Sequence, residues 1–481
     1  MPDAQLAGWR NALRRLHPAA GTWIRTRPSP VAGLAAACVA IAALSLLWPH
    51  TLTYDPWTWV RWGRQIVHGS LSTTGGTAWK PFPVIFDSVF SLFGNAAPDL
   101  WLVLARAGAL MGLVLAYQLA ARVAGWLGGI LAVAWVVVSG HDGFLYGWFL
   151  FFGSGWSEGV LVALSLGALM AHLRGTPKAA LWAWFAAALI RPEAAVFLLV
   201  YGVVVARRDP ALRKLVATLF VAVPVLWVVP DYLGSGQLLG ASKRALSEVP
   251  ASLAHAKHPG LRDIALLHDL LSPVVLAGDV LALVLARGQA RRLVLAVVGV
   301  ALAWVAIVAV MAEAGYPGIP RFLVVSVALG CVAAGIGWAC AVRLASRRAA
   351  RLAAAAAVLA VNAVFLAGHA TDLRRQVSGA RDEARQNAQL ADVLVRAGGA
   401  EAVRRCGPVR TDPLEIPALV WKLGDGSSVT YRRLRSGMIF STRVSGRRRA
   451  FPGVPAPGSG FKLIAQAGRW SVYANCRVQP G

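Results

Sequence analysis

The sequence predicts a mainly α fold, in which a polytopic bundle of about eleven membrane helices precedes a small C-terminal extracytoplasmic α/β domain. Of its 481 residues, 57% are hydrophobic and 15% are charged, and the mean hydropathy is +0.58. Soluble domains are usually about a quarter charged, so this chain is expected to lie in a bilayer. Long apolar runs begin at Val31 and stop after His369, which indicates a membrane part, 31–369, and a polar tail, 370–481.

The first apolar run, from Val31 to about Leu47, follows a basic N-terminal segment, residues 1–30. It is long enough to cross hydrocarbon and has no small-residue cleavage site after it, so an uncleaved span is favoured over a signal peptide. Basic flanks remain in the cytoplasm, which places the N-terminus inside. Nine more runs follow, near 99–120, 124–139, 156–173, 179–205, 215–230, 269–286, 293–312, 321–342 and 352–369.

Four short connections between these runs are strongly basic and are therefore expected on the cytoplasmic side. They contain Arg174 and Lys178; Arg207, Arg208, Arg213 and Lys214; Arg287, Arg291 and Arg292; and Arg343, Arg347, Arg348 and Arg351. The overall excess of 48 Lys and Arg over 22 Asp and Glu thus indicates topology, and membrane lipids rather than nucleic acid are the expected partners. The outer face then carries the loops 50–98, 140–155, 231–268 and 313–320 and the tail.

The run 179–205 lies between two basic loops and must cross the bilayer an even number of times. Arg191-Pro192-Glu193 interrupts it, leaving two arms of about 12 residues, each roughly 18 Å long and too short for the ~30 Å core. We expect a hairpin whose tip lies at membrane depth, shielded by protein. Arg191 and Glu193 are expected to pair there, because Pro192 breaks the helix, and to shape the site indirectly.

The tail is long enough for a small domain. A polar helix is expected over Thr371–Ala397, followed by short β-type runs at Ala418–Lys422, Ser428–Tyr431 and Trp470–Ala474.

Cys406 and Cys476 lie in the tail on the oxidising side, so they are candidates for a disulfide, the alternative being two buried thiols. Cys38, Cys331 and Cys340 lie in apolar runs, and the absence of CxxC or Cys/His spacing excludes a structural zinc site. Arg432, Arg433, Arg435 and Arg447 to Arg449 would suit an anionic polymer or form a solvated face.

The first outer loop carries the leading candidate for chemistry, Asp55. It lies in Tyr54-Asp55-Pro56-Trp57, and Trp79-Lys80-Pro81 follows in the same loop. The tryptophans, Trp57 and Trp79 among them, indicate an amphipathic helix at the membrane interface. The alternative for Asp55 is an ordinary helix N-cap, with proline at the first helical position.

The second outer loop offers His141 and Asp142, and then Glu158 at the start of the next span. An anion in a first helical turn is favoured without any function. However, Gly153, Gly155 and Gly159 around it admit close approach of another backbone or a ligand. Both interpretations of Glu158 therefore stay open.

Four cations are candidates for holding a phosphate at the outer face. They are Lys80, Lys243, Arg244 and Arg321, with surface solvation as the alternative for each. A carboxylate can activate a hydroxyl, and cations stabilise a departing phosphate, so the set suits glycosyl transfer from a lipid phosphate. A soluble nucleotide-sugar site is not indicated, because no Gly-rich phosphate loop follows a strand.

These motifs together resemble the GT-C superfamily of polytopic glycosyltransferases, which includes protein O-mannosyltransferases, aminoarabinose transferases and oligosaccharyltransferase subunits. An actinobacterial membrane-protein group within or beside that superfamily is the more similar. The matching pieces, in order over residues 31 to about 345, are Asp55-Pro56-Trp57, Trp79-Lys80-Pro81-x-Pro83, Ser157-Glu158-Gly159, Arg191-Pro192-Glu193-Ala194, Gly234-Ser235-Gly236 and Pro320-Arg321-Phe322.

The resemblance implies a catalytic acidic residue at Asp55, a second acidic position at Glu158, and contact of Arg321 with the phosphate of a polyprenyl-phosphate-linked sugar. It also implies inversion at the sugar carbon and a cell-envelope glycan or lipid as acceptor. Many members have two adjacent acidic residues in the first loop, whereas this chain has Tyr54-Asp55, so a bound divalent metal is not supported. A polytopic protein that binds glycolipids without chemistry, or a flippase, remains the alternative.

Overall fold

The computed structural model describes residues 31–140, 147–246, 256–443 and 450–476. The basic segment 1–30, His141 and Asp142, and Arg447 to Arg449 lie outside the described residues. The chain divides into two compact units, residues 1–37 and 38–481, and the architecture below is that of the second unit.

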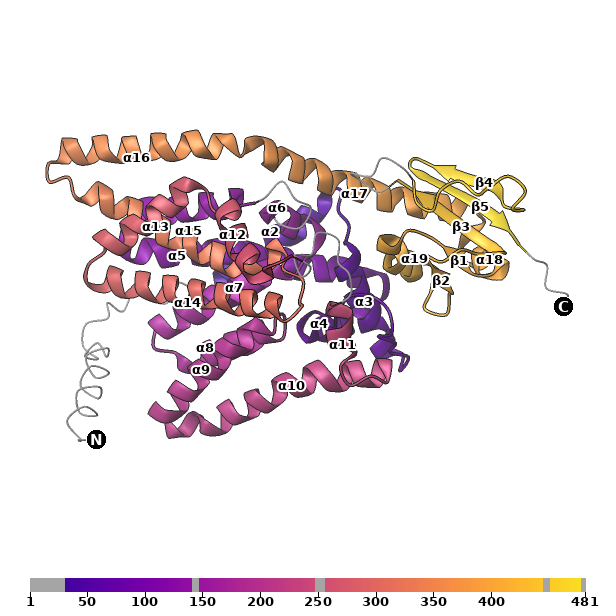
Figure 1. The fold of residues 1–481 in the computed structure, drawn as a ribbon, viewed down its shortest axis with the longest axis horizontal. Helices are drawn as coiled ribbons and strands as arrows, with labels where there is room; N and C mark the ends of the chain where they lie inside the picture. Colours follow the sequence, from indigo (N-terminus) through magenta and orange to yellow (C-terminus); the bar gives the residue numbers. More distant parts are fainter. Residues whose placement is uncertain (1–30, 141–146, 247–255, 444–449, 477–481) are drawn as a thin grey trace. The chain divides into compact units, whose positions relative to one another are not determined.

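The membrane part is helical throughout (Figure 1). Its helices are α2 (Val31–Leu44), α3 (Tyr54–Val67), α4 (Pro81–Phe90), α5 (Ala97–Val138), α6 (Trp148–Ser154), α7 (Glu158–Leu173), α8 (Pro177–Ala188), α9 (Glu193–Arg208), α10 (Arg213–Ser235), α11 (Gly240–Ala245), α12 (Pro259–Leu270), α13 (Pro273–Leu285), α14 (Gly288–Glu313), α15 (Val324–Arg343) and α16 (Arg348–Gly368). Short 3₁₀ turns are η1 (Ser45–Leu47), η2 (Ser91–Ala96), η3 (Pro210–Leu212) and η4 (Pro320–Leu323).

Five helical segments of the described chain are long and apolar enough to cross a membrane, or up to seven if each of two bent pairs forms one span. The predicted mainly helical, multi-pass fold is confirmed. The expected runs 99–120 and 124–139 both lie within α5, and they are separated by a kink at Gly125, where φ is 78° and the backbone is not helical. A positive φ costs glycine little, so the chain turns there between two helical parts.

The core is built around α15, which packs between α5 and α13. Small residues make this possible: a Cβ on Gly335 would lie 2.3 Å from the carbonyl oxygen of Gly128, and one on Gly337 would lie 1.9 Å from that of Gly278. Backbones that approach this closely pack well without the hydrophobic effect, which does not drive helices together in lipid.

The run 179–205 forms the expected hairpin, with α8 and α9 side by side (Figure 1). The helix stops before Arg191-Pro192-Glu193 and restarts at Glu193. Arg191 and Glu193 at the tip are 5% and 1% exposed and form an ion pair. The tip is therefore shielded by protein.

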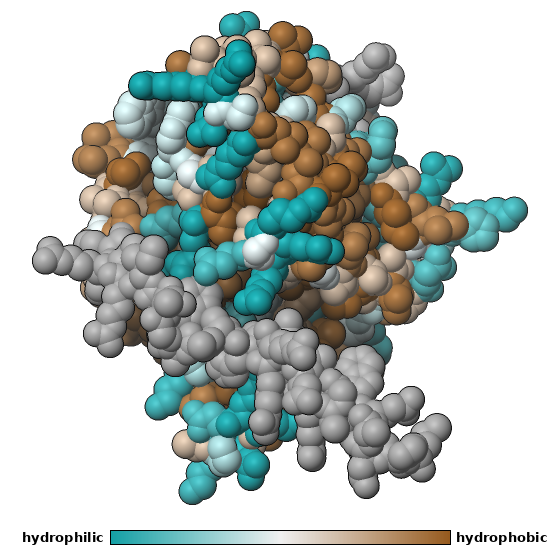
Figure 2. All heavy atoms as spheres, turned by 90° about the vertical axis from the view of Figure 1, so that its left-hand side faces the viewer, coloured by the Kyte–Doolittle hydropathy of each residue, from teal (hydrophilic) through white to brown (hydrophobic). Residues whose placement is uncertain are grey.

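The four basic connections turn toward the side that lies on the left in Figure 1. Figure 2 looks at that side, where long hydrophilic side chains stand out from a largely hydrophobic surface. These connections join α7 to α8, α9 to α10, α13 to α14 and α15 to α16, so their basic residues share one side of the bundle. This is the arrangement that the positive-inside rule anticipates for one membrane face.

The tail contains α17 (Ala370–Arg396), α18 (Gly399–Cys406), η5 (Pro413–Glu415), α19 (Ile416–Leu423) and a five-stranded sheet of order β2-β1-β3-β5-β4. The strands are β1 (Val409–Arg410), β2 (Val429–Thr430), β3 (Gly437–Thr442), β4 (Lys462–Ala467) and β5 (Trp470–Asn475). β1 pairs parallel with β2 and β3, whereas β5 pairs antiparallel with β3 and β4.

The prediction of a strand at Ala418–Lys422 is wrong, because these residues lie in α19. Pro417 stands in the first turn of this helix, where a missing N–H costs nothing, and Gly424 follows its end. The buried residues Ala418, Leu419, Val420 and Leu423 form an apolar run that suits either a buried strand or a short helix. Proline at the start decides for the helix.

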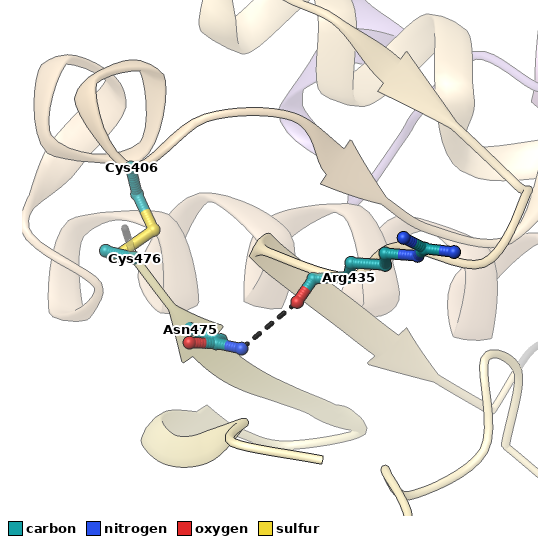
Figure 3. Close-up of a disulfide and its surroundings, with 4 residues drawn as sticks. All are labelled: Cys406, Arg435, Asn475 and Cys476. Atoms are coloured by element: carbon teal, nitrogen blue, oxygen red, sulfur yellow. Dashed lines mark hydrogen bonds between the residues drawn. A yellow bond between two sulfur atoms is a disulfide. The ribbon is translucent and has the colours of Figure 1, made fainter. Parts of the chain in front are cut away.

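Cys406, at the end of α18, forms a disulfide with Cys476, which follows β5 (Figure 3). Beside it, the amide of Asn475 donates a hydrogen bond to the carbonyl oxygen of Arg435 at 3.1 Å. The bridge joins residues 70 apart. In the chain-entropy model a loop of that length stabilises a fold by about 4 kcal/mol.

Candidate active site

A cavity of about 1140 Å³ lies where α3, the tip of the α8–α9 hairpin, α10, α11, η4 and the tail meet. Its wall is mostly apolar, including Trp227, Leu238, Leu239 and Met311. The charged residues that line it are Asp55, Lys80, Arg191, Asp231, Arg244, Arg321, Glu383 and Glu415. A mostly apolar cavity with a few convergent charges is the usual form of a ligand site.

Asp55 lies in the first turn of α3 and faces this cavity. The helix is capped at Thr53 and no capping hydrogen bond comes from a side chain, so the N-cap interpretation of Asp55 is wrong. Instead Oδ2 of Asp55 accepts a hydrogen bond from Nη1 of Arg321 at 2.9 Å. Burial would raise the pKa of Asp55, but the charges of Arg321 and Lys80 and hydrogen bonds from Arg321 and Thr77 outweigh it, so the pKa is lowered from 3.8.

Arg321 is held in η4, between Pro320 and Phe322. Its guanidinium carbon lies 4.6 Å from the centre of the Trp156 ring, a cation–π arrangement. The buried Nε has no hydrogen-bond partner within the described ranges. A buried donor without an acceptor costs about 1–3 kcal/mol, so Arg321 retains capacity for an anionic ligand.

Lys80 precedes α4 and lines the cavity, and its ammonium also has partners outside the cavity lining. Nζ donates to Oγ of Ser157 at 3.3 Å, lies 3.7 Å from Oε1 of Glu158, and stands 4.8 Å from the Trp59 ring. Glu158 is 0% exposed and is not among the residues that line the cavity. Burial lowers the pKa of Lys80, and Glu158 opposes that effect.

Gly159, next to Glu158, serves helix packing. A Cβ on Gly159 would lie 2.7 Å from Cβ of Ala109 in α5. At Gly159 the expected close approach is therefore to the backbone of another helix, α5. Glu158 itself contacts Lys80.

The other expected site residues are placed as follows. Arg191 lines the cavity, and its guanidinium carbon lies 3.5 Å from the centre of the Phe322 ring. Glu193, which does not line the cavity, forms an ion pair with Arg191.

Trp57 and Trp79 also line the cavity. The ring of Trp57 lies 6.1 Å from the Trp421 ring of the tail. Trp79 donates from Nε1 to the carbonyl oxygen of Leu226 at 3.0 Å.

Arg244 and Lys243 are separated by the fold although they are adjacent in sequence. Arg244 lines the cavity, forms an ion pair with Asp231 and donates from Nε to the carbonyl oxygen of Thr77 at 3.1 Å. Lys243 is exposed and is not a lining residue. The structure thus brings together Asp55, Lys80, Arg321 and Arg244 but not Lys243.

Sequence reasoning missed the residues that the tail contributes, Glu383, Gln386, Asn387 and Glu415, and also Asp231. Asp231 had a signal, because it is an acidic residue at the end of an apolar run. The tail residues had no such signal, because the sequence does not distinguish the polar residues of a polar helix that will line a cavity from those that will face solvent. Across the part of the chain that the structure describes, no three His, Cys, Asp or Glu side chains are grouped as metal ligands.

No protein-family model and no curated protein sequence matches this chain. Among solved structures it is similar to ArnT from Cupriavidus metallidurans bound to undecaprenyl phosphate, at 14% identity and a TM-score of 0.48, over 95% of this chain and 100% of the other. The apo form of that ArnT matches at 15% identity and a TM-score of 0.49, over 92% of this chain and 97% of the ArnT chain. An Archaeoglobus fulgidus oligosaccharyltransferase tethered with an acceptor peptide matches at 12% identity and a TM-score of 0.47. The match covers 82% of this chain and 63% of the oligosaccharyltransferase chain.

Proposed function

We propose that this protein is a membrane glycosyltransferase that moves a sugar from a polyprenyl-phosphate donor to an acceptor hydroxyl of the cell envelope at the outer face. One observation carries the proposal: Asp55 and Lys80 of the first outer loop and the distant Arg321 line one cavity, with the carboxylate of Asp55 and the guanidinium of Arg321 2.9 Å apart. A carboxylate suited to accept a proton thus stands beside cations suited to a phosphate.

The proposed transfer step is a direct displacement, with the inversion that the superfamily resemblance implies. The acceptor oxygen bonds to the anomeric carbon while the bond from that carbon to the phosphate oxygen breaks, which inverts the carbon. The hydroxyl proton passes to the Asp55 carboxylate. The electron pair of the broken bond leaves with the polyprenyl phosphate, whose added charge Arg321 and Lys80 stabilise.

Donor binding also prepares the base. Arg321 and Lys80 lower the pKa of Asp55, which makes its carboxylate a weak base. A donor phosphate between these cations offsets their charge, so the pKa of Asp55 rises when the donor is bound. The base is then stronger only when there is a sugar to transfer.

The apolar part of the cavity suits the lipid. Leu238 and Leu239, between α10 and α11, are 65% and 61% exposed, and both line the cavity together with Trp227 and Met311. Exposed leucines beside a charged site would contact acyl or prenyl chains in a bilayer. Undecaprenyl phosphate is therefore a suitable probe for the donor.

The test is Asp55→Asn, which removes the base and keeps the shape. We expect transfer to fall by about 10² or more, as for loss of a general base. The readout is mass spectrometry of envelope glycans from a deletion strain complemented with each variant, at matched protein levels. Asp99→Asn is the control, because Asp99 is 53% exposed and pairs with His50 away from the cavity. Unchanged glycans with Asp55→Asn at normal levels would favour a glycolipid-binding protein without chemistry.

A further inference from the structure

The wall of the cavity that comes from the tail has its own chemistry. Helix α17 supplies Glu383, Gln386 and Asn387, and η5 supplies Glu415. The remaining tail residues that line it are Pro413, Leu414 and Ala418, so no cation of the described tail faces the cavity. The four cations Lys80, Arg191, Arg244 and Arg321 all come from the membrane part. The cavity therefore has a basic side and an acid–amide side.

The acid–amide side consists of Glu383, Gln386, Asn387 and Glu415. Its side chains are held by hydrogen bonds, but two of its buried acceptor atoms receive none from the described residues. Gln386 is 3% exposed; its Nε2 donates to Oε1 of Glu415 at 2.7 Å, and Nε1 of Trp470 donates to its backbone carbonyl at 2.9 Å. Glu383 accepts from Oγ of Ser154 at 3.5 Å. Over the described residues, Oε1 of Gln386 and Oδ1 of Asn387 are buried without a hydrogen-bond donor. Buried acceptors of this kind favour a ligand that brings hydroxyl donors.

The two carboxyls on this side are matched to a neutral ligand. Burial raises the pKa of Glu383 to about 7, and burial together with Asp412 and Glu383 raises that of Glu415 to about 8. At pH 7 Glu415 is therefore mostly protonated and Glu383 about half protonated, and a protonated carboxyl both donates and accepts hydrogen bonds. The ionised fraction repels a phosphate or a carboxylate.

We propose that Glu383, Gln386, Asn387 and Glu415 form the acceptor subsite, and that the acceptor is a hydroxyl-rich glycan without a phosphate at the groups this subsite contacts. The glycan lies along α17 and presents one hydroxyl to Asp55 across the cavity. This inference rests on the proposed transferase function and names the acceptor class for it.

The test uses the full chain in lipid nanodiscs and an array of neutral oligosaccharides of glucose, mannose, galactose and arabinose, with phosphorylated and amino counterparts. Binding is measured by native mass spectrometry. We expect neutral members to bind about tenfold more tightly than their phosphorylated counterparts, and Gln386→Leu to weaken that binding by roughly tenfold. Gln466→Leu is the matched control, because Gln466 is an exposed glutamine in β4 outside the cavity. Asn387→Leu serves as a second variant if Gln386→Leu does not accumulate.

Three results would overturn the inference: no binding of any neutral member to the wild type, equal or tighter binding of phosphorylated members, or unchanged binding by both leucine variants. Binding of undecaprenyl phosphate, measured on the same samples, distinguishes failure of the acceptor-subsite proposal from failure of the transferase proposal. If the wild type does not bind that lipid, the transferase proposal fails whatever the glycans do. If the lipid binds normally to Gln386→Leu while glycan binding is lost, both proposals are supported.

Discussion

At the scale of single residues, the arrangement around Lys80 determines how the cavity responds to pH. Its side chain is 9% exposed, and its ammonium lies 3.7 Å from Oε1 of the buried Glu158. Burial lowers the pKa of Lys80 below 10.5, so its charge is present at low pH and is lost as the pH rises through the shifted value. Glu158 opposes the shift and thereby keeps Lys80 charged over a wider range. We regard Glu158 as a residue that positions and charges Lys80, not as one that touches the substrate.

A pH profile of donor affinity tests this role. The affinity of the wild type for undecaprenyl phosphate, measured in nanodiscs from pH 6 to 11, should begin to weaken at a pH below the ordinary lysine value. Lys80→Arg should remove the part of this loss that follows the titration of Lys80, because arginine stays protonated throughout. The part that follows the ionisation of Glu383 and Glu415, whose pKa values are about 7 and 8, should remain. Glu158→Gln should move the loss to lower pH by removing the opposing charge. Identical profiles for the wild type and Lys80→Arg would show that Lys80 does not hold the phosphate.

At the scale of elements, the α8–α9 hairpin depends on one buried ion pair. The side chains of Arg191 and Glu193 are 6% and 0% exposed and pair across Pro192. A buried charge that loses its partner typically destabilises a protein by about 3–5 kcal/mol, whereas replacing both charges by apolar groups costs much less.

We therefore expect Glu193→Leu to lower the melting temperature of the detergent-solubilised protein strongly, and Arg191→Met with Glu193→Leu to recover most of that loss. The exposed pair of Arg405 and Glu401 on α18, 74% and 73% exposed, is the comparison, and its loss should change stability by less than about 1 kcal/mol. A double variant no more stable than Glu193→Leu alone would mean that the pair does not account for the hairpin's stability.

At the scale of the whole molecule, the tail docks on the helix that carries Asp55. Asp425 accepts hydrogen bonds from Arg61 at 3.1 Å, Arg64 at 2.9 Å and Gln65 at 3.2 Å, all on α3. The guanidinium of Arg64 also lies 4.0 Å from the Trp421 ring of α19. These contacts join the two walls of the cavity, so the acceptor side depends on them.

Asp425→Ala should loosen this docking. We expect faster hydrogen exchange in α19 and around Glu383 to Asn387, and about tenfold lower transfer, with undecaprenyl phosphate affinity unchanged because the basic side stays intact. Asp382→Ala is the control, since Asp382 pairs with Arg385 and Arg469 within the tail. Normal exchange and normal transfer in Asp425→Ala would show that other contacts hold the tail.

Several features were predictable because their physical signal is local in the chain. Runs of apolar residues must be helical in a membrane, where every backbone group needs a partner within its own segment. Arg191-Pro192-Glu193 had to interrupt its run, because proline and charge both oppose a continuous span. An isolated carboxylate or arginine near a span, such as Asp55 or Arg321, is costly enough to indicate function. The apolar run Ala418–Lys422 was mistaken for a strand because a short buried helix gives the same pattern.

By itself, the sequence determined that this is a multi-pass helical protein and which charged residues needed an explanation, because hydropathy and the cost of charge act along the chain. The tertiary structure decided which of them meet: Asp55 and Arg321 pair across 266 residues, and Arg244 reaches the cavity while its neighbour Lys243 does not. It also placed the acid–amide face of α17 opposite the cations. Contacts between distant segments depend on how the helices pack against one another, and no local pattern of residues records that packing.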